Sequence, residues 1–262
     1  MHLNKPRFKG NAIGFYTLLR KEIIRFLRIW PQTLLPSAIT ISLYFIIFGH
    51  LIGSQIGDIH GVSYMQYITP GLIMMSIITN AYSNVASSLY GMRFEKSIEE
   101  LLIAPLPNYL ILLAFCCGGM ARAIVTGIIV TIVALLFTHI TVHSFSLTIG
   151  ITLLTAGFFS LAGFTNAVFA RRFDDVSIIP TFVLTPLTYL GGVFFAVSQL
   201  PPIWQVIATA NPILYIISAF RYGILGITDI NPYIAFFVIA MAVAVLYSVN
   251  LYLLRRGVGL RS

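Results

Sequence analysis

Charged side chains are scarce in this sequence: Asp, Glu, Lys and Arg make up only 9% of its 262 residues. An average soluble domain has about 25%. Hydrophobic residues make up 58%, more apolar surface than a soluble fold could bury, so the chain is expected to lie in a lipid bilayer. A spanning helix needs about 20 apolar residues, which leaves room for about six spans. The sequence therefore predicts one all-α membrane domain over residues 1–262.

Cysteines are few, and catalytic motifs are lacking. Cys116 and Cys117 are adjacent, and a disulfide between neighbours would be strained, so both are expected as free thiols. The sequence has no G-x-x-x-x-G-K-[ST] loop for nucleotide phosphates. His139 and His143 could bind a metal only if a helix paired them, and no carboxylate lies nearby. The chain is expected to be no enzyme and to bind no metal or cofactor itself.

Acidic residues are missing from the interiors of the long apolar runs. An ion-coupled carrier would be expected to have carboxylates at midmembrane, and a membrane enzyme would have clustered His, Asp and Glu at one interface. A self-contained carrier or enzyme is therefore the alternative, not the preferred interpretation. The apolar runs predict spans near residues 33–53, 67–91, 108–138, 146–170, 177–197 and 233–254.

The basic residues are present mainly on one side of this arrangement. Of 16 Lys and Arg, seven lie in residues 1–32, two in 92–107, two in 171–176 and three in 255–262. The opposite loops have only Arg221. Because positive loops stay in the cytoplasm, both termini are expected there, and nucleic acid is not an expected partner.

The segment before the first span, residues 12–30, is amphipathic and basic, and Pro31 ends its pattern. Such a helix with aromatic anchors is typical of the headgroup plane, although a plain solvated helix is the alternative. Its predicted apolar face consists of Tyr16, Leu19, Ile23, Phe26, Leu27 and Trp30.

A second amphipathic pattern is in residues 93–107, RFEKSIEELLIAPLP, which lie between two apolar runs. The pattern predicts a short helix that stops at Pro105 and Pro107. One face is expected to pack on the ends of the spans, and the other, with Glu95, Lys96, Glu99 and Glu100, to meet a partner or only solvent. The expected packing residues are Phe94, Ile98, Leu101 and Leu102.

This stretch resembles the first cytoplasmic loop of ABC-2-type permeases, the membrane subunits of ABC exporters. The likeness is in R-x-x-K-S-I-E-x-L-L-x-x-P-L, although the family often has Gly where this chain has Lys96. In that family the loop is a coupling helix that sits in a cleft of the ATPase subunit. The resemblance implies ATPase contacts at Arg93, Glu95, Lys96, Ser97, Glu99 and Glu100.

Residues 200–226 are on the predicted outer side yet strongly apolar. The piece 213–226 is too short to span a bilayer, which favours short re-entrant helices broken at Asn211-Pro212, with a loop packed on the span ends as the alternative. The segment is similar to the one before the last span of ABC-2-type permeases. Pro70-Gly71 also resembles the Pro-Gly pair at the start of their second span. The matching candidates are Pro201, Trp204, Asn211, Pro212, Tyr215, Arg221 and Gly226.

The resemblance implies a permease in a bacterial inner membrane. Two copies are expected to pair and to bind two ATPase subunits, which would hold ATP and Mg. The few charges and many aromatic residues of the spans favour a lipidic, glycolipid or amphiphilic drug-like substrate. Arg122, the basic residue inside a predicted span, is a candidate functional charge, unless it snorkels or bonds to backbone carbonyls.

Overall fold

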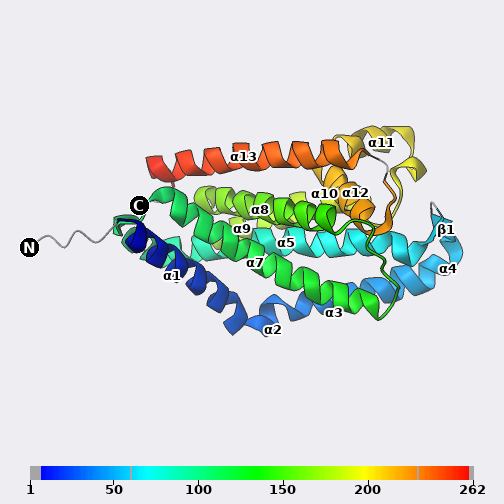
Figure 1. The fold of residues 1–262 in the computed structure, drawn as a ribbon, viewed down its shortest axis with the longest axis horizontal. Coiled ribbons are helices and arrows are strands. Elements are labelled where there is room, and N and C mark those ends of the chain that lie inside the picture. Colours follow the sequence, from blue (N-terminus) through cyan, green and yellow to red (C-terminus); the bar gives the residue numbers. More distant parts are fainter. Residues whose placement is uncertain (1–6, 60, 229, 260–262) are drawn as a thin grey trace, which may run out of the picture.

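The structure is a computed structural model that describes residues 7–59, 61–228 and 230–259. Its long helices run side by side along the longest axis of the molecule (Figure 1). The predicted termini at residues 1–6 and 260–262 lie outside the described residues.

The elements are short at the start of the chain and long in the middle. The first third has α1 (Arg7–Arg28), α2 (Trp30–Thr33), α3 (Leu35–Tyr44), the π-helix η1 (Phe45–Ile52), α4 (Gly53–Ile56), β1 (Asp58–Ile59), β2 (Val62–Ser63) and α5 (Tyr64–Phe94). The middle has α6 (Ser97–Ile103), α7 (Asn108–Leu135) and α8 (Phe145–Phe169). The last third has α9 (Phe173–Ile179), the π-helix η2 (Pro180–Leu184), α10 (Thr185–Leu190), the 3₁₀ turn η3 (Val197–Gln199), α11 (Pro202–Thr209), α12 (Pro212–Leu225) and α13 (Pro232–Arg256).

Four helical segments of the described chain are long and apolar enough to cross a bilayer: Trp30–Gly49, Asn108–Leu135, Phe145–Phe169 and Pro232–Arg256. They correspond to the first, third, fourth and sixth predicted spans. The pair α11 and α12 would be a fifth if it crossed as one bent unit. The all-α membrane class is confirmed, while the count of six spans stays a prediction.

The predicted span near 67–91 is α5, the central helix of the bundle, which contacts α7, α8 and α12. Its 31 residues are enough to cross a bilayer, but several of its polar side chains are buried against other helices. Polar side chains are tolerated in a membrane-spanning helix where they face other helices and not lipid. The buried polar side chains of α5 are Thr69, Ser76, Asn80, Asn84 and Ser88.

The predicted span near 177–197 is placed differently by the structure. Helical backbone begins earlier, at Phe173, and ends at Leu190, with η2 from Pro180 inside it. A turn follows at Gly191 and Gly192, where Gly192 has a φ of 77°. The predicted boundary was wrong because the apolar run continues through Val193 and Phe194 after the glycine turn has ended the helix.

The two ends of the bundle differ in content (Figure 1). The terminal end, as we call it, contains the start of α1 and the end of α13. The hairpin end contains α4, α11 and the antiparallel pair β1–β2, in which Asp58 faces Ser63.

Candidate functional site

The short helix α6 connects the end of α5 to the start of α7 at the terminal end of the bundle. The turn before it includes Lys96, which has a left-handed backbone with a φ of 59°. After α6, Leu106 packs against Gly14 of α1, so the segment is held on both sides of the helix.

One face of α6 packs on the bundle and the other is exposed. Ile98 is 2% exposed, and Leu101 and Leu102 are half-buried against the core. The exposed side chains of this segment are Glu95, Lys96, Glu99 and Glu100, while Ser97 is half-buried and donates to the carbonyl of Met92. The exposed face therefore has more negative than positive charge.

Phe94 corrects the predicted packing face, because its side chain is 80% exposed. The prediction treated 93–104 as one continuous helix. The left-handed turn at Lys96 instead separates α5 from α6 and resets the helical phase. Phe94 therefore follows the geometry of α5, while Ile98 begins the packed face of α6.

Arg93, whose predicted contact with an ATPase stays a prediction, makes hydrogen bonds within the chain. Its guanidinium donates to the carbonyls of Ala167, Val168 and Ala170, at the C-terminal end of α8. Helix ends have carbonyls without intrahelical partners, and a cation there is favourable. Arg93 thus fixes the end of α5 to the end of α8.

The apolar segment at the hairpin end forms two helices, α11 and α12, bent by 84° at their junction. Asn211 begins α12, and its side chain accepts from the backbone N–H of Ile213 at 3.0 Å. Pro212 occupies the first helical position, where no N–H is required. At the other end, Gly226 closes the helix with a φ of 74°. These residues explain the break that was predicted at Asn211-Pro212.

Three further candidates of this segment, Pro201, Trp204 and Tyr215, are exposed or half-buried. Trp204 is 48% exposed on α11, next to the helix start at Pro201. The Tyr215 hydroxyl donates to the carbonyl of Thr209 at 2.9 Å and closes the bend.

Arg221, the basic residue predicted in an outer loop, is only 1% exposed. Its guanidinium lies 3.9 Å from the centre of the Tyr67 ring and donates to the Tyr67 and Gly192 carbonyls. The side chain therefore joins α12, α5 and the turn after α10.

Arg122 lies within α7 and contacts two other elements. Its Nε donates to Asn80 Oδ1 at 3.1 Å, and Nη2 donates to the Thr33 carbonyl at 3.2 Å. Asn80 in turn donates to Ser37 Oγ at 3.0 Å. Arg122 thus links α7 to α5 and to the first span, partly through a backbone carbonyl, the arrangement expected if it has a structural role.

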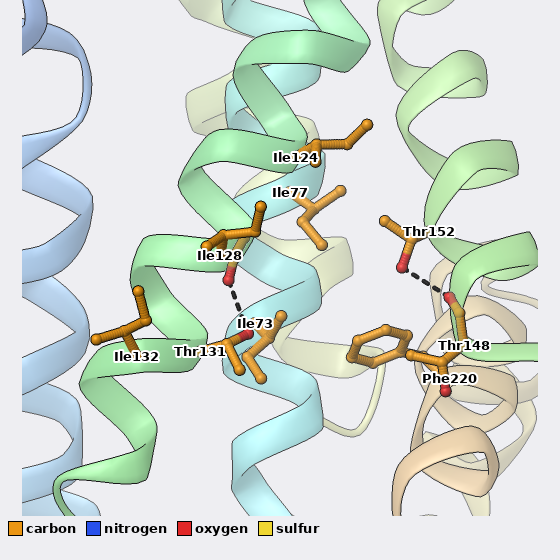
Figure 2. Close-up of a pocket in the computed structure, with 10 residues that line it drawn as sticks. Ile73, Ile77, Ile124, Ile128, Thr131, Ile132, Thr148, Thr152 and Phe220 are labelled. Carbon is orange, nitrogen blue, oxygen red and sulfur yellow. Dashed lines mark hydrogen bonds between the residues drawn. The ribbon is translucent and has the colours of Figure 1, made fainter. Parts of the chain in front are cut away.

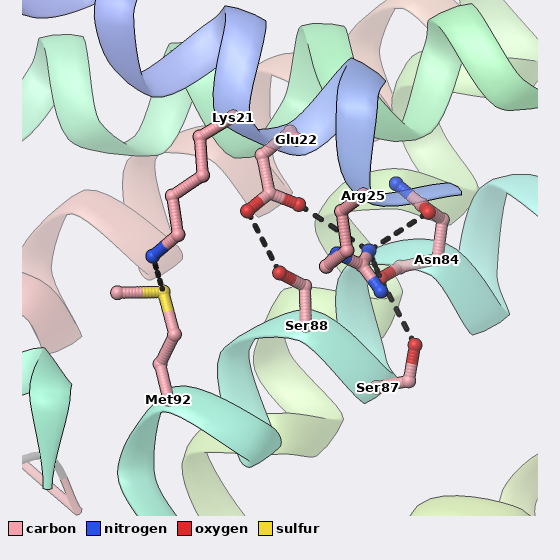
Figure 3. Close-up of polar contacts among 7 residues, drawn as sticks. All are labelled: Lys21, Glu22, Arg25, Asn84, Ser87, Ser88 and Met92. Carbon is pink, nitrogen blue, oxygen red and sulfur yellow. Dashed lines mark hydrogen bonds and ion pairs between the residues drawn. The ribbon is translucent and has the colours of Figure 1, made fainter. Parts of the chain in front are cut away.

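A buried polar cluster between α1 and α5 was not predicted (Figure 3). Glu22 is fully buried, accepts from Ser88 Oγ at 2.8 Å, and lies 3.3 Å from Arg25. Arg25 also donates to the backbone and side-chain oxygens of Asn84, both at 2.9 Å. We call Glu22, Arg25, Asn84 and Ser88 the latch cluster. Its only sequence signal is that Glu22 is the sole acid before Asp58.

The latch cluster changes the predicted face of α1. The buried residues are Leu18, Glu22 and Phe26, one turn apart, and α1 packs on α7. Tyr16, Leu27 and Trp30, predicted on a common face, are exposed. The buried Glu22 carboxylate has one partner on α1, Arg25, and one on α5, Ser88.

The loop between α7 and α8 contains His139 and His143. No helix pairs them, since helical backbone stops before His139 and resumes at Phe145. Residues 7–59, 61–228 and 230–259 contain no group of three or more His, Cys, Asp or Glu that could hold a metal ion.

A cavity of about 250 Å³ lies between α5, α7, α8 and α12 (Figure 2). Ile73, Ile124 and Phe220 contribute apolar surface, and its three threonine hydroxyls have partners, that of Thr148 being the Ser144 carbonyl at 2.8 Å. Thr131 donates to the Gly127 carbonyl at 2.7 Å, and Thr152 donates to that of Thr148 at 2.8 Å. The cavity thus presents an almost purely apolar lining.

A second cavity of about 380 Å³ lies between α5, α8, α13 and the α9–η2–α10 segment, next to the start of α12. Aromatic residues dominate it, among them Tyr82, Phe158 and Phe159, and no charged side chain lines it. Both cavities suit apolar molecules better than ions.

Comparison with known proteins gives a consistent result. A sequence model of the family described as ABC-2 type transporter matches residues 14–225. The chain is 54% identical over 250 residues to a protein of Escherichia coli (strain K12) named inner membrane transport permease YadH, covering 95% of this chain and 98% of that one.

More distant relatives are named nodulation protein J. The one from Neorhizobium galegae is 23% identical over 250 residues, 94% of this chain and 95% of that protein. The one from Rhizobium leguminosarum bv. viciae is 27% identical over 217 residues, 82% and 83% of the respective chains.

Proposed function

This chain belongs to the ABC-2 type transporter family, and we propose that it is the membrane-spanning subunit of an exporter driven by a separate ATPase. The chain supplies the path through the membrane, and the ATPase subunit binds ATP and Mg and supplies the energy. This division of labour fits a sequence that has no phosphate-binding loop of its own.

The observation that supports the coupling role best is the two-sided construction of α6. Ile98 is buried against the bundle, while Glu99 and Glu100 are exposed at the terminal end. A helix built this way can bind a soluble subunit with one face and transmit its displacement through the other. ATP binding can move the spans in this way only if the two conformations of the complex bind ATP differently.

A symmetric exporter of this kind requires two copies of the chain. Each described chain has one α6, so a complex with two ATPase subunits needs two permease copies. We propose a homodimer with one ATPase bound at each α6.

The substrate is proposed to be lipidic, a glycolipid or an amphiphilic drug-like molecule. Neither cavity has a charged lining residue, and a bare ion would find no compensating charge there. The location is proposed to be a bacterial inner membrane, with both termini in the cytoplasm. The name of the Escherichia coli relative supports the location, and the basic residues of the terminal end support the orientation.

Charge reversal on α6 tests the coupling role. Glu99→Lys and Glu100→Lys, singly and together, should purify normally from membranes yet lose the ATPase on co-purification and lose export. Reversing a charge at a desolvated contact costs several kcal/mol of binding. Leu101→Asp should instead destabilise the permease itself, because Leu101 is half-buried against the core.

Asp58→Lys is the matched control, since Asp58 is exposed at the hairpin end and its reversal should leave ATPase binding unchanged. If α6 were only a solvated connector, reversals at 99 and 100 would change stability by less than about 0.5 kcal/mol and would retain the ATPase. That result would refute the coupling role.

A further inference from the structure

The cavity of about 380 Å³ combines an apolar lining with a polar group that lacks a partner. The Tyr82 side chain is 1% exposed, and its hydroxyl makes no hydrogen bond with the described residues. A buried hydroxyl without a hydrogen bond has lost its bonds to water without compensation, which is unfavourable. A protein that keeps such a group at the wall of a cavity gains most when a ligand satisfies it.

The other polar side chains at this cavity are already engaged. Thr165 donates to Asn250 Oδ1 at 2.9 Å, and Asn166 donates to the Val176 carbonyl at 3.3 Å while lying beside Tyr82. The Tyr82 hydroxyl interacts with the nearby Asn166 side chain but makes no hydrogen bond of ordinary geometry with it, so its proton can be donated to an incoming molecule.

The cavity of Figure 2 gives an internal comparison. It also lies between spans, but its threonine hydroxyls donate to carbonyls of their own helices. Nothing at that cavity selects a polar group on a ligand. Only the Tyr82 cavity, of the two, has both the apolar volume and a donor.

The size and place of the Tyr82 cavity limit the ligand. Ligand sites of roughly 300–1,000 Å³ are typically apolar and aromatic with a few polar groups that fix orientation, and about 380 Å³ lies in this range. Pro212 and Ile213, at the bend between α11 and α12, form part of the wall. A ligand in this cavity would therefore contact the junction between α11 and α12.

We propose that the Tyr82 cavity binds the apolar chain of an amphiphile whose oxygen atom accepts a hydrogen bond from Tyr82. The amphiphile is either a bilayer lipid or the transported molecule, and only the second source rests on the proposed export function. Phe158, Phe159 and Leu246 contact the chain, and the hydroxyl of Tyr82 selects an ether, ester, carbonyl or alcohol oxygen over pure hydrocarbon.

The test uses the full chain in phosphatidylcholine nanodiscs without any ATPase. The probes are a photoreactive long-chain fatty alcohol and the matching photoreactive hydrocarbon, and cross-linked residues are mapped by mass spectrometry. The alcohol should label residues around Tyr82 and Phe159 more strongly than the exposed Phe237 of α13. Ala162→Trp, which fills the cavity, should abolish this labelling.

Two variants make the test specific. Tyr82→Phe removes only the hydroxyl and should weaken alcohol binding by about threefold to tenfold without changing labelling by the hydrocarbon. Ile128→Trp, in the cavity of Figure 2, should change neither. The proposal would be overturned if the alcohol labelled cavity residues and lipid-facing residues equally. It would also be overturned if Tyr82→Phe had no effect, or if a second copy of the chain occupied the cavity and kept the probe out.

The source of the ligand is read from the assembled exporter. Release of the bound alcohol on ATP addition, in a complex with the ATPase, assigns the site to cargo; retention assigns it to a bilayer lipid. Both results keep the site. Because binding is measured without the ATPase, a failure of α6 to couple leaves this result unaffected, and the reverse also holds.

Discussion

Lys96 is the only residue other than glycine with a positive φ in the part of the chain that the structure describes. A left-handed backbone costs an L-residue roughly 1–2 kcal/mol relative to a right-handed one, and glycine avoids this cost. ABC-2-type permeases, which this stretch resembles, often have glycine at this position. The structure supplies the physical reason, which is the turn that separates α5 from α6.

Replacing this residue separates its backbone role from its side-chain role. Lys96→Gly should raise the free energy of unfolding by about 1 kcal/mol, measured by thermal unfolding in detergent. Lys96→Ala keeps the strain and should bring no such gain. If the ammonium contacts the ATPase, both variants should lose the same affinity on co-purification. A Gly variant no more stable than the Ala variant would contradict the strain at Lys96.

Single residues show where sequence reasoning reached its limit. Asn211 and Pro212 have strong local preferences for a helix start, so the break was predictable. Arg221 and Glu22 have no such local signal, because their partners Tyr67 and Ser88 are far away in the sequence. From sequence alone, a charged side chain near the end of a span is predicted to be exposed, and only the fold shows that it is buried.

Among the elements, α1 is held unusually closely to α7. A Cβ on Gly118 would lie 2.7 Å from the Glu22 Cβ, so only glycine allows the latch cluster to form at this spacing. Helix–helix contacts in membranes favour small residues for this reason.

The pair Gly118→Ala and Gly91→Ala tests this contact. Both add the same methyl group to a helix, but a Cβ at Gly91 would meet nothing within 4 Å. Gly91→Ala should stabilise the protein by about 0.5–1 kcal/mol, whereas Gly118→Ala should destabilise it by about 1–3 kcal/mol. Thermal unfolding compares them. Equal effects would show that α1 does not depend on this contact.

Prediction at the level of elements depended on how local the signal was. The long apolar helices α7, α8 and α13 were predictable, because length and composition decide them. The prediction of one continuous helix over 93–104 was wrong, because the spacing of apolar residues gives no sign of the turn at Lys96. The C-terminal end of the α9–η2–α10 segment was predicted wrongly, because the apolar run continues beyond the last helical residue. The two-cavity arrangement depends on packing between distant helices, which periodicity does not describe.

For the molecule as a whole, orientation in the membrane is the main expectation to test. With Cys116 and Cys117 replaced by alanine, a cysteine at Asp58 should react with an impermeant reagent in intact cells, and one at Ser97 should not. Cysteines at Gln199 and Thr228, which flank α11 and α12, should both react if that pair re-enters on one side. The reverse pattern at 58 and 97 would overturn the orientation and the docking of an ATPase at α6.

The latch cluster also sets an order of events during biosynthesis. Ser88 leaves the ribosome 66 residues after Glu22, a delay of several seconds at about 5–20 residues per second. Until α5 arrives, the Glu22 carboxylate has no site in the bundle and α1 must wait at the membrane surface. The first helix to be synthesised can therefore dock only after α5 has been made, and a nascent chain stalled before residue 84 should leave it undocked.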